Sequence, residues 1–189
     1  MRFFKNQFRT MLAVLAMMIS CESSELLAFV SADQPMTGIS STGNIISIWS
    51  VYDNANASYV IRTSTWDSIN GWSSNATIST IPSQSFNPLL AVNGTGNAAV
   101  IWTTLDTNNL PTLQGRIYYN GAWDSGPTQF SATDESIISY KLKLNDSGEI
   151  SVIWSSYPPS SSDSAVYALT GSTVAGGWNT ASGITKISD

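Results

Sequence analysis

Acidic side chains occupy corresponding places in three loops of this sequence. Asp53, Asp106 and Asp163 each fall in a loop that joins two expected strands. Two opposed carboxylates are the acid and the base of a glycosidase, so these residues are the first candidates for catalysis. Aspartates in exposed loops are more often turn formers, because their side chains accept hydrogen bonds from the nearby backbone. We therefore expect these three residues to shape loops, and we predict no catalytic residue.

The chain lacks the side chains on which most hydrolases and metal sites depend. It contains no histidine, which removes the usual general base and the commonest metal ligand. Its single cysteine excludes an intrachain disulfide and a cysteine-based zinc site. It has neither a Gly-x-Ser-x-Gly elbow nor an Asp-x-Asp-x-Asp-Gly calcium loop. We expect no enzyme activity, no cofactor and no metal.

A binding role is the better interpretation of the same loops. The segments 50–57, 103–113 and 155–164 combine tyrosine, asparagine and aspartate with small polar residues. Aromatic rings stack on a neutral sugar or a peptide, and amides and carboxylates form directional hydrogen bonds with it. The competing interpretation is a set of solvated loops rich in turn formers. The candidate ligand-binding residues are Tyr52, Asp53, Trp66, Asp106, Asn108, Asn109, Tyr157 and Asp163.

Three repeats must position these loops. The strings at 43–49, 96–102 and 148–154 align without a gap, and their leading glycines are 53 and 52 residues apart. Each string ends in tryptophan, and a second tryptophan follows in every repeat. A fixed period of this length indicates a chain of similar supersecondary units. Trp66 has no tryptophan counterpart in the other repeats, which is why it stands among the candidate binding residues.

Each repeat has the pattern of β-strands. Apolar and polar residues alternate in 139–144, as is typical of a half-buried antiparallel strand. Asn-Gly and Asp-x-Gly turns at 93–97 and 145–148 supply the positive φ that a hairpin needs. The expected strands are a first at 88–92 and 139–144, a second at 43–49, 98–102 and 149–154, a third at 58–65, 115–120 and 165–170, and a fourth at 76–81, 128–132 and 183–188. The sequence thus predicts an all-β fold of three tandem four-stranded antiparallel units.

A four-stranded unit of this length, repeated in tandem, resembles a blade of a β-propeller. The resemblance covers about residues 26–189, and the repeats are similar to bacterial propeller repeats of the sialidase-like and kelch-like groups. The Ser-x-Asp-x-Gly-x-x-Trp box and the kelch double glycine are absent. The predicted fold is a propeller-like arc with blades at 35–87, 88–139 and 140–189, after a segment at 22–34 that holds one extra strand.

The resemblance also bears on activity and assembly. Sialidases on a propeller hold the substrate carboxylate with three arginines, whereas Arg62 and Arg116 are the only arginines after the first 20 residues. These two arginines are expected at matching places in the first two blades. Closed propellers have four or more blades, so three blades leave open edges. We therefore expect a partial ring, or a homo-oligomer that completes it through these blade edges.

The tryptophans are expected to build the core, because repetition in register favours packing over sugar stacking. We expect the first tryptophan of each repeat to pack between neighbouring blades and to contribute roughly 2–3 kcal/mol of stability. We expect the second tryptophan to cap a blade edge. The first set is Trp49, Trp102 and Trp154, and the second set is Trp72, Trp123 and Trp178.

The first 21 residues form an export signal. Residues 1–9 are cationic, residues 10–19 are apolar apart from Thr10, and Cys21 is the only cysteine. This arrangement resembles a bacterial lipoprotein signal, in which the cysteine becomes the lipidated N-terminus. The apolar run is shorter than the about 20 residues that span a bilayer, so we predict export and lipidation at Cys21. The alternative is plain secretion with cleavage after 30–32.

The charge balance excludes two classes of partner. The chain carries 8 basic and 13 acidic residues, for a net charge of −5, and three of the basic residues lie in the leader. An acidic body argues against nucleic acid and against anionic membranes. Membrane contact is therefore expected through the lipid anchor only.

Together these features predict an exported, non-enzymatic protein of the cell envelope that presents polar loops to a carbohydrate or a protein. One alternative is a degenerate or truncated propeller of the glycosidase or sialidase type. Another is a structural envelope protein that associates with itself through its open blade edges.

Overall fold

The computed structural model describes residues 32–158, 161–174 and 177–188 of the chain. These residues belong to one compact unit, Ser31–Asp189. The predicted leader, Cys21 and most of the segment at 22–34 lie outside the described residues. None of the described helices is long and apolar enough to cross a membrane.

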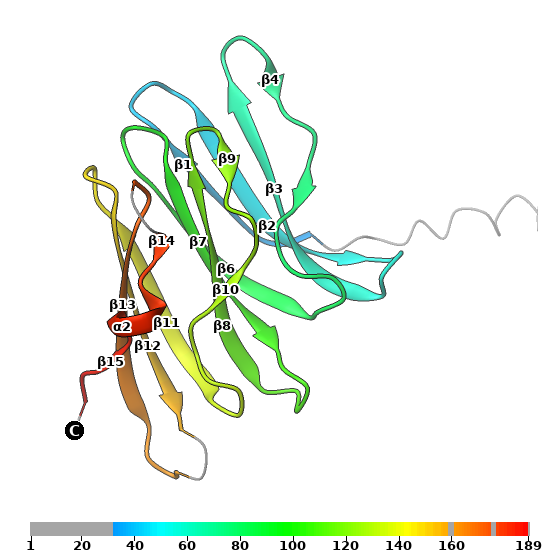
Figure 1. Ribbon diagram of the computed structural model, residues 1–189. Helices are drawn as coiled ribbons and strands as arrows, with labels where there is room; N and C mark the ends of the chain where they lie inside the picture. The colour runs from blue at the N-terminus through cyan, green and yellow to red at the C-terminus, as the bar shows by residue number, and fades with distance from the viewer. Residues whose placement is uncertain (1–31, 159–160, 175–176, 189) are drawn as a thin grey trace, which may run out of the picture. The chain divides into compact units, whose positions relative to one another are not determined.

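The predicted all-β fold of three tandem blades is confirmed (Figure 1). Each blade is an antiparallel sheet whose three long strands follow one another along the chain as a meander. Sheet A consists of β1 (Ala32–Ile39), β2 (Ile45–Asp53), β3 (Ser58–Asp67), β4 (Gly71–Trp72) and β5 (Ala76–Thr77). Sheet B consists of β6 (Ser85–Val92), β7 (Ala98–Leu105), β8 (Pro111–Tyr119), β9 (Ala122–Trp123) and β10 (Thr128–Gln129). Sheet C consists of β11 (Ser136–Leu144), β12 (Glu149–Tyr157), β13 (Ala165–Ser172), β14 (Gly177–Trp178) and β15 (Thr185–Lys186), with a short helix α2 (Thr180–Gly183) before β15.

The second strands extend beyond the predicted tryptophan ends. β2, β7 and β12 each continue for three or more residues after the tryptophan of the repeat. The added residues include serines and threonines, of which Ser50 and Ser156 are buried. These polar residues remain in the strand because pairing with the neighbouring strand, and not their own weak preference for loops, determines where the strand ends.

The fourth strand of each blade is split, which the sequence did not predict. Two short pieces pair separately with the third strand, as β4 and β5 do with β3. At Gly71, where φ is +72°, the chain turns sharply before it leaves the ladder. A repeated serine then attaches the second piece, because its Oγ accepts a hydrogen bond from a backbone N–H of the third strand. The pairs are Ile61 to Ser79 at 3.0 Å, Leu113 to Ser131 at 2.8 Å and Val166 to Ser188 at 3.0 Å.

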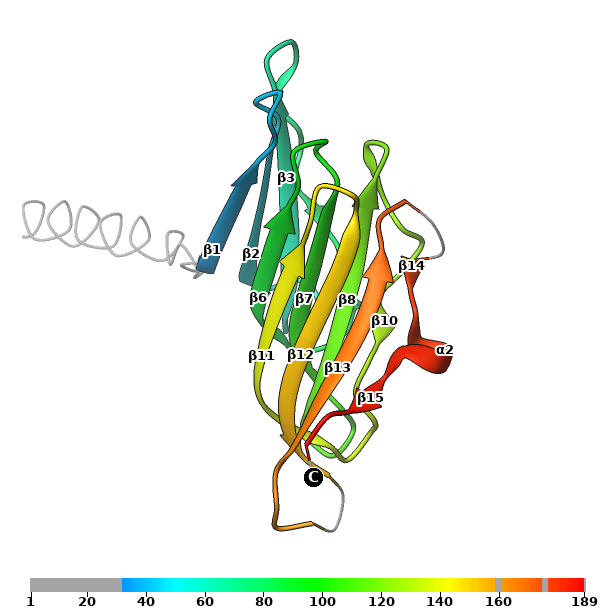
Figure 2. The same ribbon diagram turned by 90° about the vertical axis from the view of Figure 1, so that its left-hand side faces the viewer.

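The three sheets pack face to face in an open arc (Figure 2). The first strands β1, β6 and β11 lie side by side along one edge of the arc. Two hydrogen bonds join these first strands, because Asn87 accepts from both neighbours. Its Oδ1 accepts from Nε2 of Gln34 at 2.7 Å, and its backbone carbonyl oxygen accepts from the hydroxyl of Tyr140. In the described part of the chain, sheets A and C each keep one face that no other sheet covers.

Two apolar cores join the sheets, and each has the same plan. The core between sheets A and B consists of Ile48, Ile61, Ile78, Val100 and Trp102. The core between sheets B and C includes Ile101, Leu113, Phe130, Val152 and Trp154. In both cores a tryptophan of the later sheet packs against three apolar residues of the earlier one. The prediction that Trp102 and Trp154 lie between blades is therefore confirmed, with exposed fractions of 0% and 2%.

Trp49 differs from its two counterparts. Its neighbour Ile48 faces sheet B, and because successive side chains of a strand alternate, Trp49 faces away from sheet B. It is partly exposed there. The prediction of packing between blades is therefore wrong for Trp49, because no described sheet lies on that side of sheet A.

Two of the second tryptophans, Trp123 and Trp178, pack between sheets and are not edge caps. Trp178 is buried and packs on Phe130 of sheet B, with ring centroids 4.6 Å apart. Trp123 packs against the core between sheets A and B. Trp72 is 57% exposed, again because it belongs to the first sheet of the arc. The prediction was wrong because these residues pack across to the preceding sheet, which the sequence of one repeat does not show.

Candidate functional site

Seven of the eight candidate residues lie at one end of the three sheets. We call this end the rim; it is formed by the β2–β3, β7–β8 and β12–β13 loops and by the connections from each sheet to the next (Figure 1). Trp66 is the exception, because it pairs with Trp72 at the opposite end of β3. Tyr118 holds the corresponding place in sheet B, where it pairs with Trp123. The structure thus separates Trp66 from the other candidates.

Asp53 shapes its own loop. Its Oδ1 accepts the N–H of Ala55 at 3.1 Å, and its Oδ2 accepts the side-chain amide of Asn56 at 2.8 Å. The hydrogen bond from Asn56 is the main reason that the pKa of Asp53 lies below its ordinary value. A guanidinium nitrogen of Arg62 lies 3.9 Å from Oδ2. The carboxylate is therefore ionised and held in a turn.

Asp106 ties two rim segments together. Its Oδ1 accepts the N–H groups of Asn108 at 2.8 Å and Leu110 at 2.9 Å, and its Oδ2 accepts the N–H of Asp134 at 3.2 Å. The bond from Leu110 is the largest cause that lowers the pKa of Asp106. Asn108 donates from its side chain to Asp134, and Asn109 has a φ of +60°. These three candidates form a rigid turn.

The remaining rim candidates stand apart from one another. Asp163 belongs to an exposed turn in which its N–H donates to Ser161 Oγ at 3.1 Å. Tyr157, at the end of β12, is 45% exposed. Tyr52 packs edge-on against Tyr59, with centroids 5.2 Å apart. In the described segments, no three Asp, Glu, Cys or His side chains come together as metal ligands would.

The two arginines do not occupy matching places. Arg62 stands opposite Trp49, whereas Arg116 stands opposite Val100, two residues earlier in the repeat. Arg116 donates through Nε to Asp124 at 2.7 Å. The expectation of matching places was wrong because the loop between the second and third strands differs in length between the blades. Each arginine instead pairs with a local carboxylate.

A hollow of about 360 Å³ opens at the rim between sheets B and C. Phe130 and the segment that follows it form one side, and Trp154, Tyr167 and Pro158 form the other. Glu135 lies within it and is only 5% exposed. We call this the rim hollow. Sequence reasoning missed it because Glu135, just before β11, and Tyr167, on β13, come together only through the pairing of the strands of sheet C.

Glu135 presents a buried carboxylate to the rim hollow. Its Oε2 accepts the N–H of Ala132 at 3.1 Å, and its Oε1 accepts the hydroxyl of Ser156. A buried charge is costly unless hydrogen bonds satisfy it. A carboxylate has about four acceptor sites, so these two bonds leave capacity for further donors.

Two aromatic rings line the rim hollow beside that carboxylate. Trp154 and Tyr167 are stacked, with centroids 5.6 Å apart and planes 18° from parallel. The indole Nε1 of Trp154 is buried, and among the described residues it has no hydrogen-bond partner. The rim hollow therefore combines a hydrogen-bond acceptor and an aromatic surface, which together suit a ligand with hydroxyl groups and apolar C–H faces.

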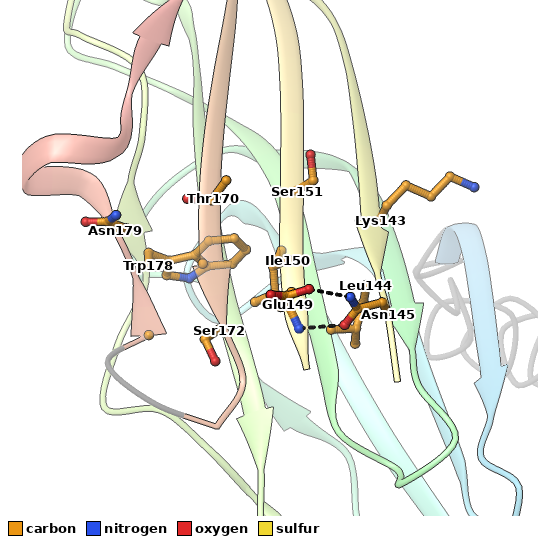
Figure 3. Close-up of a pocket in the computed structure, with 12 residues that line it drawn as sticks. Lys143, Leu144, Asn145, Glu149, Ile150, Ser151, Thr170, Ser172, Trp178 and Asn179 are labelled. Carbon is orange, nitrogen blue, oxygen red and sulfur yellow. Dashed lines mark hydrogen bonds between the residues drawn. The ribbon is translucent and has the colours of Figure 1, made fainter. Parts of the chain in front are cut away.

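A larger hollow, of about 1080 Å³, lies on the uncovered face of sheet C. Figure 3 shows Lys143, Ser151 and Thr170 in a row across β11, β12 and β13. Asn145 donates from its side chain to Glu149 at 2.6 Å and accepts the N–H of Glu149 at 2.8 Å (Figure 3). Leu144, Ile150 and Trp178 line it together with these polar residues.

Comparison with protein-family models gives no match, and comparison with curated proteins gives no significant match.

Proposed function

We propose that the protein is an exported, non-enzymatic binding protein of the β-propeller type, which holds a neutral saccharide at its rim at the cell envelope. The observation that carries the proposal is the buried carboxylate of Glu135 beside the stacked rings of Trp154 and Tyr167. Saccharide hydroxyls donate to carboxylates, and the C–H face of a sugar ring packs on aromatic rings. Export and envelope location rest on the basic start, the apolar run and Cys21.

The rim aspartates support binding over hydrolysis. The oxygens of Asp53 and Asp106 accept hydrogen bonds from their own loops. A catalytic pair needs one carboxyl group with a raised pKa as the acid, whereas the pKa values of both residues are lowered. Rigid turns of this kind hold a binding surface in one conformation, which reduces the entropic cost of ligand capture.

The test is a fluorescence titration of the full-length chain with cellotriose, maltotriose and chitotriose as probes. Trp154 lies in the rim hollow, so binding there should change tryptophan emission. We expect Glu135→Gln to weaken binding about tenfold or more, because a hydrogen bond to a charged group contributes about 1.5–3 kcal/mol. The substitution keeps the size of the side chain, and thermal unfolding checks that the variant is folded.

Asp67→Asn is the matched control, since it makes the same carboxylate-to-amide change in the β3–β4 turn of sheet A, at the end opposite the rim. It should leave the affinity unchanged. If none of the three probes binds, or if Glu135→Gln binds as tightly as the original chain, the rim hollow is not a saccharide site.

A further inference from the structure

The uncovered faces of sheets A and C are the two halves of one repeated contact. We define the outer face of sheet A by Ile39, Ile45, Trp49, Trp66 and Trp72. These residues share one side of the sheet, because Ile45 pairs with both Ile39 and Trp66, Trp66 pairs with Trp72, and Trp49 alternates with Ile48. We define the outer face of sheet C by Ile153, Val166 and Ile187.

The outer face of sheet C repeats the three apolar residues that receive a neighbouring sheet elsewhere. One residue of each set directly precedes the tryptophan of strand β2, β7 or β12. Another lies on the following long strand and donates its N–H to the repeated serine. The last directly precedes that serine, and its N–H donates to the carbonyl of the residue on the long strand. The sets are Ile48, Ile61 and Ile78 in sheet A, Ile101, Leu113 and Phe130 in sheet B, and Ile153, Val166 and Ile187 in sheet C. All members of the first two sets are buried, with exposed fractions of 3% or less. In sheet C, Ile153 is 39% exposed and Ile187 is 54% exposed.

The outer face of sheet A repeats the opposite half of the contact. Trp49 corresponds to Trp102 and Trp154, each of which covers an apolar set of the preceding sheet. Trp72 corresponds to Trp178, which packs on Phe130 at 4.6 Å. Trp49 is partly exposed, Trp72 is 57% exposed, and Ile39 on the same face is 65% exposed. These residues lack the apolar set that their counterparts cover.

The hollow on sheet C is the space that a following sheet fills elsewhere (Figure 3). On sheet A, the corresponding surface retains a hollow of only about 220 Å³, and residues 95–97 and 118–121 of sheet B line its other side. On sheet B it retains about 280 Å³, lined by 172–174 of sheet C. The hollow of about 1080 Å³ on sheet C therefore marks a docking position without its sheet.

We propose that a second copy of this chain docks head to tail, with its outer face of sheet A on the outer face of sheet C. Trp49 of one copy then covers Ile153, Val166 and Ile187 of the other, as Trp102 and Trp154 do within the chain. The same chain carries both halves of this contact, which is why a second copy is the occupant that fits. Such a heterologous contact closes into a ring if the rotation permits and otherwise continues as a filament. This inference goes beyond the proposed saccharide site and does not involve the rim hollow.

Two lysines limit the strength of this contact. Lys141 and Lys143 stand on the first strand of sheet C where sheet A has Met36 and Gly38. A Cβ at Gly38 would lie 2.4 Å from a methyl carbon of Val92, so a lysine at that place holds the incoming sheet further away. The head-to-tail contact is therefore centred on the three apolar residues, and Lys143→Ala should strengthen it.

Sedimentation velocity over a range of concentrations, on the chain as recovered from the expressing bacterium, tests the proposal. We expect reversible association that weakens at least tenfold in Trp49→Ser and in Ile187→Lys, and that tightens in Lys143→Ala. Ile69→Lys is the control, because Ile69 is 90% exposed at a loop tip outside both faces. If circular dichroism shows that Trp49→Ser is not folded, Trp72→Ser replaces it on the same face.

A mixing experiment separates head-to-tail docking from any other arrangement. Each single variant keeps one intact face, so an equimolar mixture of Trp49→Ser and Ile187→Lys should form a one-to-one pair although neither variant associates alone. If only the sheet A variant dissociates the assembly, two sheet A faces pair with each other and head-to-tail docking is refuted. A monomer at all concentrations for the original chain and for Lys143→Ala also overturns the proposal.

Discussion

Removal of the indole at the same repeat position should lower the free energy of unfolding by very different amounts in sheets A and B. Trp102 is 0% exposed between two sheets, whereas Trp49 is partly exposed on the outer face of sheet A. A buried tryptophan covers about 200 Å², which at about 25 cal/mol per Å² corresponds to roughly 5 kcal/mol. The buried Nε1 of Trp102 has no hydrogen-bond partner among the described residues. Removal of this unsatisfied donor offsets about 1–2 kcal/mol of the destabilisation.

We therefore expect Trp102→Ala to lower the free energy of unfolding by about 3–4 kcal/mol, within the usual range for such truncations. Trp49→Ala should cost about 1–2 kcal/mol, because solvent or rearranged neighbours fill the space that its ring leaves at a surface. Urea unfolding measures both changes. With a slope of about 2 kcal/mol per molar, the two midpoints should differ by about 1 M.

The comparison must be made at a low protein concentration, where head-to-tail docking does not bury Trp49. Equal losses of stability in Trp49→Ala and Trp102→Ala would refute the reasoning, because the repeat position would then be equally buried in both sheets. A larger loss in Trp49→Ala would place an additional packing partner on sheet A.

Three further changes probe other parts of the chain. Ser131→Ala leaves the buried N–H of Leu113 without its acceptor, so thermal denaturation should show a loss of about 1–3 kcal/mol. Burial raises the pKa of Tyr140 to about 12, so an absorbance titration at alkaline pH should show a tyrosine that ionises only near pH 12. Because this pKa is raised on folding, its contribution to stability is complete below pH about 10 and is lost as the pH rises toward 12. Tyr140→Phe should remove both effects, and a single transition for all tyrosines would contradict the assignment. Cys21→Ser should abolish a diacylglyceryl mass increment and release the protein from the membrane fraction, whereas an unchanged mass would show that Cys21 is not lipidated.

The repeat was readable because the same residue types recur at a fixed spacing. The glycines and tryptophans predicted the number of sheets, their strand order and the burial of Trp102 and Trp154. The burial of Trp49 was mispredicted, since every repeat looks alike in sequence while, among the three described sheets, only the middle one has neighbours on both sides. Position in the arc, and not residue type, decides whether such a tryptophan is covered.

The candidate site was harder to predict than the fold. Local rules identified Asp106 and Asn109 as turn formers, because the hydrogen bonds that they make are local. Glu135 gave no such signal, since its partner Ser156 and its aromatic neighbour Tyr167 lie on β12 and β13, more than 20 residues away along the chain. The serine that attaches the fourth strand does recur in the sequence, as an apolar residue followed by serine at 78–79, 130–131 and 187–188.

The identical plan of the two cores has a consequence for how such a gene can change. Each sheet meets its neighbours through a tryptophan on one face and three apolar residues on the other. A tandem duplication of 85–135 would insert a new sheet that finds a compatible neighbour on both sides at once. Deletion of the same segment would join the apolar set of sheet A to the tryptophan of sheet C. The length of the array can therefore evolve by whole repeats without an intermediate that exposes a new core, while the rim loops diverge independently of it.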